Sequence, residues 1–450
     1  MDGASGDSAD RNTRKFVCIV EKKDTKEMYA MKYMRKAVCI EKDAVRNVLR
    51  EMDILMGLDN SFLVNLWFTF QDEEDLFVVV DLLLGGDLRY HLQQGNKFSE
   101  DVVILYVIEI SLALEYLRKN RIIHRDIKPD NLLLDSKGHV HLTDFNVATV
   151  MEDDNTLATS MSGTIPYMAP EIFRTSVCQS RGYTHEVDWW SLGVTAFELL
   201  KGKRPYHITA GTNTAEIIQM FDSSCVILPN NWSKNFKDLV KKLLHIDPDM
   251  RLNNVEKLKE CELMDAVKFE AVKNKDVPVS FIPSKDHLNC DPTYELEEMI
   301  IEPNPLHKKK KRLAKQCSNK IDSSKAELTP MQKKLKTLSD DFKPYNRERE
   351  KILLQSQELN NIDGEIVAEE KDANSTDDDV CHRENDKTME KQLTSDSEMA
   401  MEKAENVHEW RTMSSKTRKG KRKTRKKKTN KKYQKSLTTM VIVLQVINKN

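Results

Sequence analysis

The chain has 450 residues and carries 71 Lys and Arg against 72 Asp and Glu, a formal net charge of −1, which excludes a chain that is basic or acidic throughout. Charged residues make up 32% of the chain and hydrophobic residues 39%, above and below the averages of about 25% and about 45–50% for globular proteins. That balance indicates a globular part joined to a polar part, and no apolar run reaches the roughly 18–20 residues of a membrane span.

Strands and one helix alternate at the front of the chain. Residues 16–20 and 28–33 have the composition of strands around a polar turn, EKKDTKE. Residues 44–56 carry apolar side chains at helical spacing, and residues 63–70 and 76–81 again read as strands. Roughly the first 85 residues therefore predict a sheet interrupted by one helix.

Long helical patterns dominate from residue 100 onward. They cover residues 101–118, 187–201 and 235–244, and a further strand is predicted at 139–143. Strands and helices separated in this way predict an α+β chain, in which a small β-rich lobe is followed by a larger helical lobe.

Three charged stretches follow residue 305. A basic cluster, HKKKKR, occupies residues 307–312, residues 367–405 are rich in Asp, Glu, Ser and Asn, and residues 416–435 contain 13 Lys and Arg. Such stretches bury too little apolar surface to offset chain entropy, so we expect disorder. The tract at 416–435 has three candidate uses, which are nuclear import, nucleic-acid contact and binding to an anionic membrane surface, beside a solvated tail with no partner. Because Tyr433 is its one aromatic residue, specific stacking on bases is not expected.

One loop carries the strongest chemical signal. The run HRDIKPDN at 124–131 places a carboxylate, a cation and an amide, those of Asp126, Lys128 and Asn131, between two apolar stretches, and Asp144 adds a second carboxylate. Phosphoryl transfer needs such a set, because a carboxylate must orient the attacking hydroxyl, a cation must balance charge and oxygen ligands must hold magnesium. A surface loop with chance charges is the alternative, and the order and spacing argue against it.

These residues resemble those of the eukaryotic protein kinases, and more narrowly those of the AGC-type serine/threonine kinases of the YANK family. The segments that carry the narrow resemblance are DLLLGGDLRYHLQQ at 81–94, HRDIKPDNLLLD at 124–135, the unusual DFN at 144–146, VDWWSLGVTAFELL at 187–200, FIPSKDHLNCDPTYELEEMI at 281–300 and PLHKKKKRLAK at 305–315. The resemblance implies a bilobal protein kinase fold that uses ATP with Mg²⁺, and Mn²⁺ is an alternative ion.

The resemblance also divides the chain into segments. These are an atypical N-terminal segment at 1–15, an incomplete kinase N-lobe at 16–84, the C-lobe at 85–270, an AGC-like C-terminal tail at 271–350, and a disordered tail, acidic and then basic, at 351–450. Within the AGC-like tail, Phe342 and Tyr345 resemble a degraded hydrophobic motif that would dock beside the helix predicted at 44–56. Two scattered aromatic residues in a disordered tail are the alternative.

Catalytic roles follow from the same resemblance. Asp126 would be the catalytic base that orients the substrate hydroxyl, and Lys128 would balance charge on the γ-phosphate. Asn131 and Asp144 would hold the magnesium ions.

Nucleotide binding is implied in the same way. Lys32 would contact the α- and β-phosphates and pair with Glu51, although a Lys on a strand and a Glu on a helix are often only solvated surface. The residues implied to surround adenine are the gatekeeper Val80, the hinge from Asp81 to Leu83, and the flanking Val17, Ala30 and Leu133. Ordinary core packing is compatible with these last three roles.

Structural and regulatory roles are implied for residues around the catalytic set. Glu171, in the APE element, would pair with Arg251, and Asp188 would cap the backbone of the catalytic loop. Ser160 lies where AGC kinases carry an activating phosphothreonine, and a phosphate there would pair with Arg125. An unmodified loop serine is the alternative.

Substrate selection and one departure from the family pattern involve further residues. Thr164 would contact the catalytic loop. The acids Asp87, Asp130 and Glu198 occupy positions that read substrate arginines in basophilic relatives, and they permit a basic substrate. Asn146 replaces the usual glycine of DFG, and because Asn tolerates positive φ better than most residues, it is compatible with activity.

The glycine-rich phosphate loop is the main departure. In this group of kinases a valine ends that loop fifteen residues before the strand lysine, as Val17 stands before Lys32. The glycine positions then fall on Asp10, Asn12 and Lys15. Asp10 would bring negative charge towards the phosphates, so we expect a replaced N-terminal segment, weaker ATP binding and reduced or absent activity.

The expected function is transfer of the ATP γ-phosphoryl group to Ser or Thr hydroxyls of protein substrates. The rival is a non-catalytic kinase-fold protein that binds partners. No specific nucleic-acid partner is expected, and the oligomeric state is left open. Because the N-terminus has no secretory signal and the 8 cysteines form no CxxC pair, we expect an intracellular chain, cytoplasmic with the nucleus as a second candidate.

Overall fold

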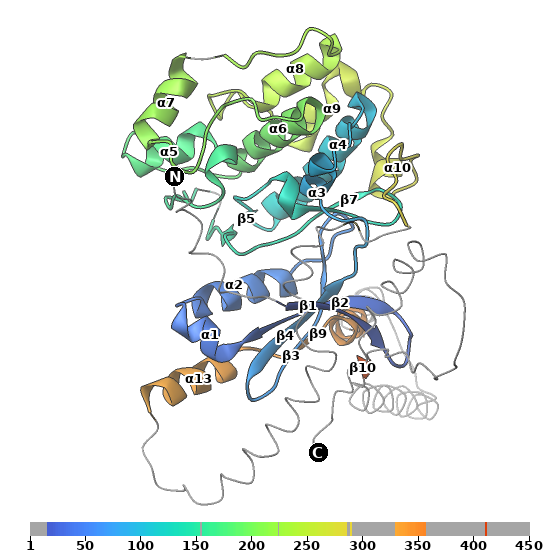
Figure 1. Ribbon diagram of the computed structural model, residues 1–450, viewed down its shortest axis with the longest axis vertical. Helices are drawn as coiled ribbons and strands as arrows, with labels where there is room; N and C mark the ends of the chain where they lie inside the picture. Colours follow the sequence, from blue (N-terminus) through green and yellow to red (C-terminus); the bar gives the residue numbers. More distant parts are fainter. Residues whose placement is uncertain are drawn as a thin grey trace, which may run out of the picture.

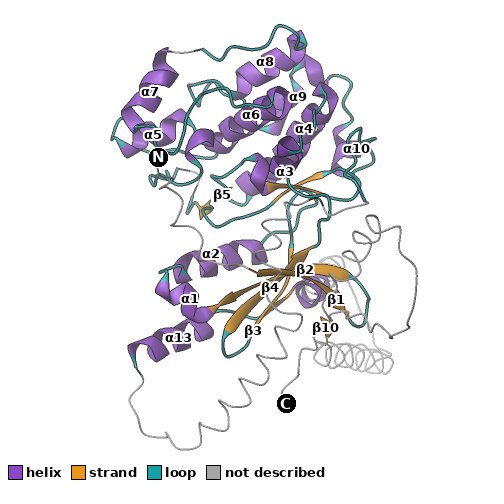
Figure 2. Ribbon diagram, viewed as in Figure 1, coloured by secondary structure: helices purple, strands orange, loops and turns teal. Residues whose placement is uncertain are grey.

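The computed structural model describes residues 16–153, 155–223, 225–285, 289, 329–356 and 410–411. Figure 1 shows two lobes, one built around a sheet and the other mainly of helices. Figure 2 shows that most strands gather in the first lobe and most helices in the second. The α+β class and the order of the two lobes along the chain are therefore confirmed.

The small lobe is built on an antiparallel sheet in the order β10-β1-β2-β4-β3-β9. Its strands are β1 (Phe16–Lys22), β2 (Met28–Arg35), β3 (Leu66–Gln71), β4 (Asp75–Asp81), β9 (Tyr345–Asn346) and β10 (Trp410–Arg411). Lys32 of β2 lies opposite Val17 of β1, and Ala30 of β2 lies opposite Val80 of β4. Strands from late in the chain, β9 and β10, thus form both edges of the sheet.

Two helices, α1 (Lys36–Glu41) and α2 (Val45–Met56), pack on this lobe where the sequence predicts one. α2 buries the apolar face that its spacing predicts. The N-cap of α1 makes no side-chain capping bond, so the sequence has no clear start signal for this helix. The buried Lys36 holds it in place instead, because its ammonium donates to Asp72 O (2.7 Å) and Ser339 Oγ (2.8 Å).

The strand expected at 63–70 begins only at Leu66. The residues just before Leu66 lie outside the sheet and form backbone hydrogen bonds with the large lobe. Leu142 donates its N–H to Phe62 O (2.8 Å) and accepts at its carbonyl from the N–H of Val64 (2.9 Å). Tertiary pairing between the lobes therefore overrides the strand pattern of this segment.

The large lobe is helical. Its helices are α3 (Leu88–Gln93), α4 (Glu100–Lys119), α5 (Pro170–Ser176), α6 (Glu186–Lys201), α7 (Thr214–Ser223), α8 (Lys234–Leu243), α9 (Val255–Lys259) and α10 (Phe269–Lys273). Its short strands pair as β5 (Ile122–Ile123) with β8 (Thr149–Val150) and β6 (Leu132–Leu134) with β7 (Val140–Leu142). Single 3₁₀ turns are η1 (Pro129–Asn131), η2 (Ile165–Tyr167) and η3 (Glu262–Met264). α6 is buried almost all round, which explains its nearly continuous apolar run.

A segment late in the chain folds back on the small lobe. α13 (Pro330–Asp341) begins with a capping box between Thr329 and Gln332, and Figure 1 shows it beside α1. Phe342, 1% exposed, joins the core that also contains α2, and Tyr345 donates from its hydroxyl to Met56 O (3.2 Å). The predicted docking of these two aromatic residues is confirmed.

Helical residues continue through 347–356, so the part of the predicted disordered tail at 351–356 is helical. The acidic stretch at 367–405 and the basic tract at 416–435 lie entirely outside the described residues. In the described ranges, a helix with the length and hydropathy of a membrane span is absent.

Candidate active site

A buried carboxylate fixes the catalytic loop. Asp188, in the first turn of α6, accepts hydrogen bonds from the backbone N–H groups of His124 (2.8 Å) and Arg125 (2.7 Å), which confirms the predicted cap. Arg125 has φ of 68°, a left-handed conformation that persists only where the surroundings impose it. Burial raises the pKa of Asp188 to about 6, against the lowering effect of the two N–H groups.

Asp126 lies at the centre of a polar cluster. Its carboxylate accepts hydrogen bonds from Asn131 Nδ2 (2.9 Å) and Thr164 Oγ1 (2.6 Å), and it pairs with Lys128 Nζ (2.9 Å). Lys128 also donates to Thr164 Oγ1 (2.7 Å), so the predicted contact of Thr164 with this loop is confirmed. Burial by itself would raise the pKa of Asp126, but hydrogen bonds from Lys128 and Thr164 outweigh it and hold that pKa below its ordinary value. The carboxylate is therefore ionised and can orient a hydroxyl.

The residues expected to hold magnesium flank the open end of the β6–β7 hairpin, where the N–H of Thr143 donates to Asn131 O (3.0 Å). Asn131 donates from Nδ2 to Asp126 O (2.8 Å) as well as to its carboxylate, which leaves Asn131 Oδ1 as a ligand atom. Asp144, half-buried, follows β7. No group of three His, Cys, Asp or Glu side chains suited to a metal occurs in the described part of the chain. Two oxygen donors fit Mg²⁺, which usually takes its other ligands from phosphate and water.

The tolerance of Asn146 for positive φ is not used in this structure. The left-handed residue of this turn is Asp144, with φ of 69°, and among the described residues Asn146 is not one of those with positive φ. The backbone at this position therefore does not require glycine. This supports the view that Asn146 is compatible with an active site.

Most of the residues expected around adenine pack against one hydrophobic core that spans both lobes. Ala30, Leu83 and Leu133 all pack against the hydrophobic core that contains Val80. Val17, on β1, is 47% exposed and stands apart from that core. Within this set, Ala30 lies directly opposite Val80 in the sheet, and Val17 is exposed on β1.

The structure does not show the ion pair that is expected between the described residues Lys32 and Glu51. Lys32 lies on β2 and Glu51 is buried on α2. No hydrogen bond or ion pair between these two described residues is found, so their pairing stays a prediction.

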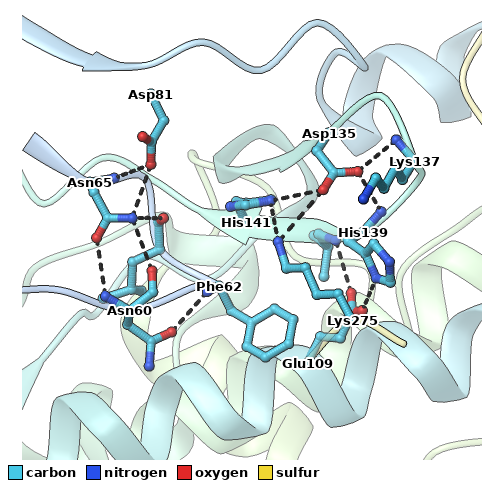
Figure 3. Close-up of polar contacts among 12 residues, drawn as sticks. Asn60, Phe62, Asn65, Asp81, Glu109, Asp135, Lys137, His139, His141 and Lys275 are labelled. Atoms are coloured by element: carbon cyan, nitrogen blue, oxygen red, sulfur yellow. Dashed lines mark hydrogen bonds and ion pairs between the residues drawn. The ribbon is translucent and has the colours of Figure 1, made fainter. Parts of the chain in front are cut away.

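The hinge is held by residues that the sequence does not single out. The carboxylate of Asp81 accepts from the backbone N–H (2.8 Å) and Nδ2 (3.0 Å) of Asn65, as Figure 3 shows, and from Trp67 Nε1 (2.6 Å). The N–H of Asp81 donates in turn to Asn65 O (3.1 Å). The side chain of Asp81 is therefore hydrogen-bonded to β3 and to the residue just before it. Any contact of the hinge with adenine would be made by backbone groups.

A polar cluster in the large lobe joins Lys275, which follows α10, to the β6–β7 hairpin, and Figure 3 shows Lys275 beside His141 and Asp135. Lys275 Nζ lies 2.8 Å from His141 Nε2 and 3.6 Å from Asp135 Oδ2, and it sits 5.2 Å from the ring centroid of Phe62. Burial lowers the pKa of Lys275, although the Asp135 carboxylate opposes that effect. The cluster braces the segment from which Asp144 extends.

Residue 289 crosses the hinge. Asn289 donates from Nδ2 to Leu84 O (3.0 Å) and Ser284 O (2.8 Å). Gly86 has φ of 74°, and a Cβ on it would lie 1.9 Å from Asn289 O. Only glycine fits this close crossing, and the described part of the family-like segment at 281–300 therefore packs against the hinge.

The segment between Asp144 and Glu171 is tied to the catalytic loop through Ser160. Arg125 NH1 donates to Ser160 Oγ (2.6 Å), and Tyr183 donates from its hydroxyl to Ser160 O (2.5 Å). Ser160 is exposed. The hydroxyl expected to carry a phosphate thus lies beside the arginine expected to bind it.

The predicted pair between Glu171 and Arg251 is confirmed. Arg251 is fully buried, and its NH1 and NH2 lie 2.6 Å and 2.9 Å from the two carboxylate oxygens of Glu171. The guanidinium also lies 5.2 Å from the ring centroid of Trp190. This bidentate contact joins α5 to the segment before α9.

All three acids expected to read substrate arginines already have internal partners. Asp87 caps α3 by accepting from the N–H of Tyr90 (2.7 Å). Asp130 and Glu198 both pair with Arg89. The sequence gives no signal for this role of Arg89, because an arginine in the first turn of a short helix is usually solvated.

A two-lobed fold with this cluster around Asp126 defines the protein kinases, and the chain belongs to that family: residues 15–263 match the family model described as protein kinase domain. Among its relatives, serine/threonine-protein kinase 32C of Homo sapiens is 53% identical over 345 residues, 76% of this chain and 70% of that protein. Serine/threonine-protein kinase 32B of Homo sapiens is 54% identical over 334 residues, 74% of this chain and 80% of that protein. The serine/threonine-protein kinase AtPK2/AtPK19 of Arabidopsis thaliana is 37% identical over 275 residues, 60% of this chain and 56% of that protein. The chain is a serine/threonine protein kinase of the AGC-type YANK family.

The three positions of the missing loop glycines, Asp10, Asn12 and Lys15, lie outside the described residues. The family match begins at the last of them. The effect of these substitutions stays a prediction.

Proposed function

We propose that Asp126 orients the Ser or Thr hydroxyl that receives the γ-phosphoryl group of ATP. The observation that carries the proposal is the cluster in which Lys128, Asn131 and Thr164 all reach the Asp126 carboxylate within 2.9 Å. An ionised carboxylate at this point can accept the hydroxyl proton. Lys128 places positive charge where negative charge develops on the transferring group.

The remaining site residues are proposed to hold the nucleotide. Asn131 and Asp144 would bind Mg²⁺, with Mn²⁺ as a substitute, and the ion supplies charge compensation on the phosphates. Lys32 would contact the α- and β-phosphates with Glu51 as its partner. The residues proposed to surround adenine are Val17, Ala30, Val80, Asp81, Leu83 and Leu133.

We propose further that the activity is low. Backbone N–H groups of a glycine-rich loop normally cover the phosphates, and Asp10, Asn12 and Lys15 stand at its glycine positions. A kinase-fold protein that binds partners without catalysis is the second candidate, and these three residues favour it. The intact set from Lys32 to Asp144 favours the enzyme.

Transfer of radiolabel from ATP to a Ser or Thr peptide, with Mg²⁺ or Mn²⁺, tests the proposal. We expect Asp126→Asn to reduce the rate about 10²–10⁴-fold, the usual contribution of a positioned acid or base. Asp101→Asn, which changes an exposed acid on α4, is the matched control and should retain the wild-type rate. Equal incorporation by wild type and Asp126→Asn would show that the label comes from elsewhere and would favour the non-catalytic candidate.

The basic tract at 416–435 carries a separate proposal, namely that it directs the chain to the nucleus or to an anionic membrane surface. Fusion of this tract to a fluorescent protein tests it. Nuclear or membrane enrichment of the fusion would support a role in targeting, and a uniform distribution would leave a solvated tail.

A further inference from the structure

A cation from the chain itself occupies the acidic patch beside the catalytic loop. Arg89, on α3, places NH1 2.9 Å from Glu198 Oε1, NH2 3.3 Å from Glu198 Oε2 and Nε 3.2 Å from Asp130 Oδ2. Its NH2 also donates to the hydroxyl of Tyr167, which donates to Glu198 Oε2 (2.5 Å). All three guanidinium nitrogens are therefore engaged.

This cluster lies next to the position of the acceptor hydroxyl. Asp130 belongs to the same loop as Asp126, and Tyr167 follows closely on Thr164, which donates to the Asp126 carboxylate (2.6 Å). A peptide whose hydroxyl reaches Asp126 must pass over the neighbouring surface. The side chains of Arg89 and Asp130 are 25% and 46% exposed, so they form part of that surface.

The geometry around Glu198 is the one that recognises arginine. A planar guanidinium binds a carboxylate through two parallel N–H groups, and Arg89 makes this contact with a carboxylate whose side chain is only 8% exposed. An arginine of a substrate would need the same two oxygens. It would also meet the like charge of Arg89, which is held between Glu198 and Asp130.

We propose that Arg89 is a specificity-determining residue, which fills the place of a substrate arginine and so selects peptides with an uncharged side chain at this subsite. The third acid, Asp87, accepts a hydrogen bond at Oδ1 from the N–H of Tyr90 at the start of α3. The inference rests on the proposed function and deepens it by naming the class of substrate.

Peptides with a single arginine test this specificity. The parent peptide contains one serine among alanines. Each variant peptide carries one arginine, placed at a different position beside that serine. For wild type we expect no position to raise kcat/KM more than about twofold over the parent. In Arg89→Ala the two carboxylates are released, and we expect at least one position to gain about tenfold or more, because the substrate guanidinium can then make charge-assisted hydrogen bonds to Glu198.

Three further variants keep the result specific. Arg89→Gln keeps an N–H donor for Glu198 but removes the positive charge. It should show the same gain, and it keeps the test usable if Arg89→Ala folds poorly. Glu198→Gln in the Arg89→Ala background should abolish the gain. Arg204→Ala removes a neighbouring guanidinium, which lies 5.8 Å from the ring centroid of Tyr167, and it should behave as wild type.

Binding of the same peptides with alanine in place of serine, measured by fluorescence anisotropy, separates this inference from catalysis. A gain in affinity for the arginine peptide in Arg89→Ala, with no transfer by any variant, would support the role of Arg89 and refute the proposed function. An unchanged preference in both Arg89 variants would overturn the inference. A wild type that already favours arginine about tenfold through Glu198 would overturn it as well.

Discussion

Asp126 and Asp188 show how neighbouring groups shift the pKa values of two buried carboxylates in opposite directions. Asp126 receives side-chain hydrogen bonds from Lys128 and Thr164, which lower its pKa despite burial. Asp188 is fully buried and receives only backbone N–H groups, so burial dominates and its pKa rises to about 6. The first carboxylate stays ionised, as its proposed role requires, and the second holds the backbone of the loop.

Asp188 therefore makes stability depend on pH. Because folding favours its protonated form, the stability that this group contributes is complete below its ordinary pKa of 3.8 and is lost as the pH rises through about 6. We expect the free energy of unfolding of wild type, relative to Asp188→Asn, to fall by about 1 kcal/mol between about pH 5 and about pH 8. Urea denaturation of both proteins across this range measures the difference. A difference that does not change with pH would contradict the assignment.

The pair of Glu171 and Arg251 makes a second prediction at this scale. Removal of one partner leaves a buried charge without its counter-ion, which typically costs about 3–5 kcal/mol. We expect losses of this size in the free energy of unfolding for both Glu171→Gln and Arg251→Met, measured by urea denaturation. The double variant should lose much less than the sum of the two, since it buries no unpaired charge. Strictly additive losses would show that the two residues do not act as a pair.

At the scale of elements, the segment from α13 to β9 completes the small lobe. Phe342 enters the core beside α2, and β9 pairs with β3. Arg347, 2% exposed, donates to the carbonyl oxygens of Leu58 and Leu66 and pairs with Asp59 (2.9 Å). This segment therefore braces both α2 and β3.

Loss of the Phe342 side chain should weaken this bracing. We expect Phe342→Ala to lower the free energy of unfolding of the small lobe by about 3–5 kcal/mol, the usual cost of removing a buried aromatic ring. Hydrogen exchange at the amides of β3 and α2 should become faster. Ile352→Ala, at a position 54% exposed in the helical residues that follow β9, is the control and should change stability by less than about 0.5 kcal/mol. Equal exchange rates in both variants would show that the segment is not part of the folded lobe.

The elements that the sequence predicts are those with local signals. α2 and α6 follow from apolar spacing, and the loop around Asp126 follows from its order of charged residues. α1 is missed because its anchor is a contact of Lys36 with Ser339, far along the chain. The contact of Arg89 with Glu198 is missed for the same reason, since Glu198 lies on another helix. Non-local polar contacts of this kind leave no trace in spacing or composition.

At the scale of the whole molecule, the chain joins a catalytic loop with all its expected residues to an N-terminal sequence that lacks the expected glycines. The contacts of Asp126, Asp188 and Arg251 are those of an ordered large lobe. The sequence places Asp10 and Asn12 where glycines are expected. The central claim is that chemistry depends on Asp126 and that its rate is limited by the missing glycines.

The most direct test compares initial rates of phosphoryl transfer at varied ATP in four forms of the full chain: wild type, a variant with Asp10→Gly, Asn12→Gly and Lys15→Gly together, and each of these with Asp126→Asn. We predict that the three glycines raise kcat/KM for ATP about tenfold or more, because a hydrogen bond to a phosphate contributes about 1.5–3 kcal/mol. We also predict that Asp126→Asn reduces the rate about 10²–10⁴-fold in both backgrounds. Equal rates with and without the glycines, or transfer that survives Asp126→Asn, would contradict this account.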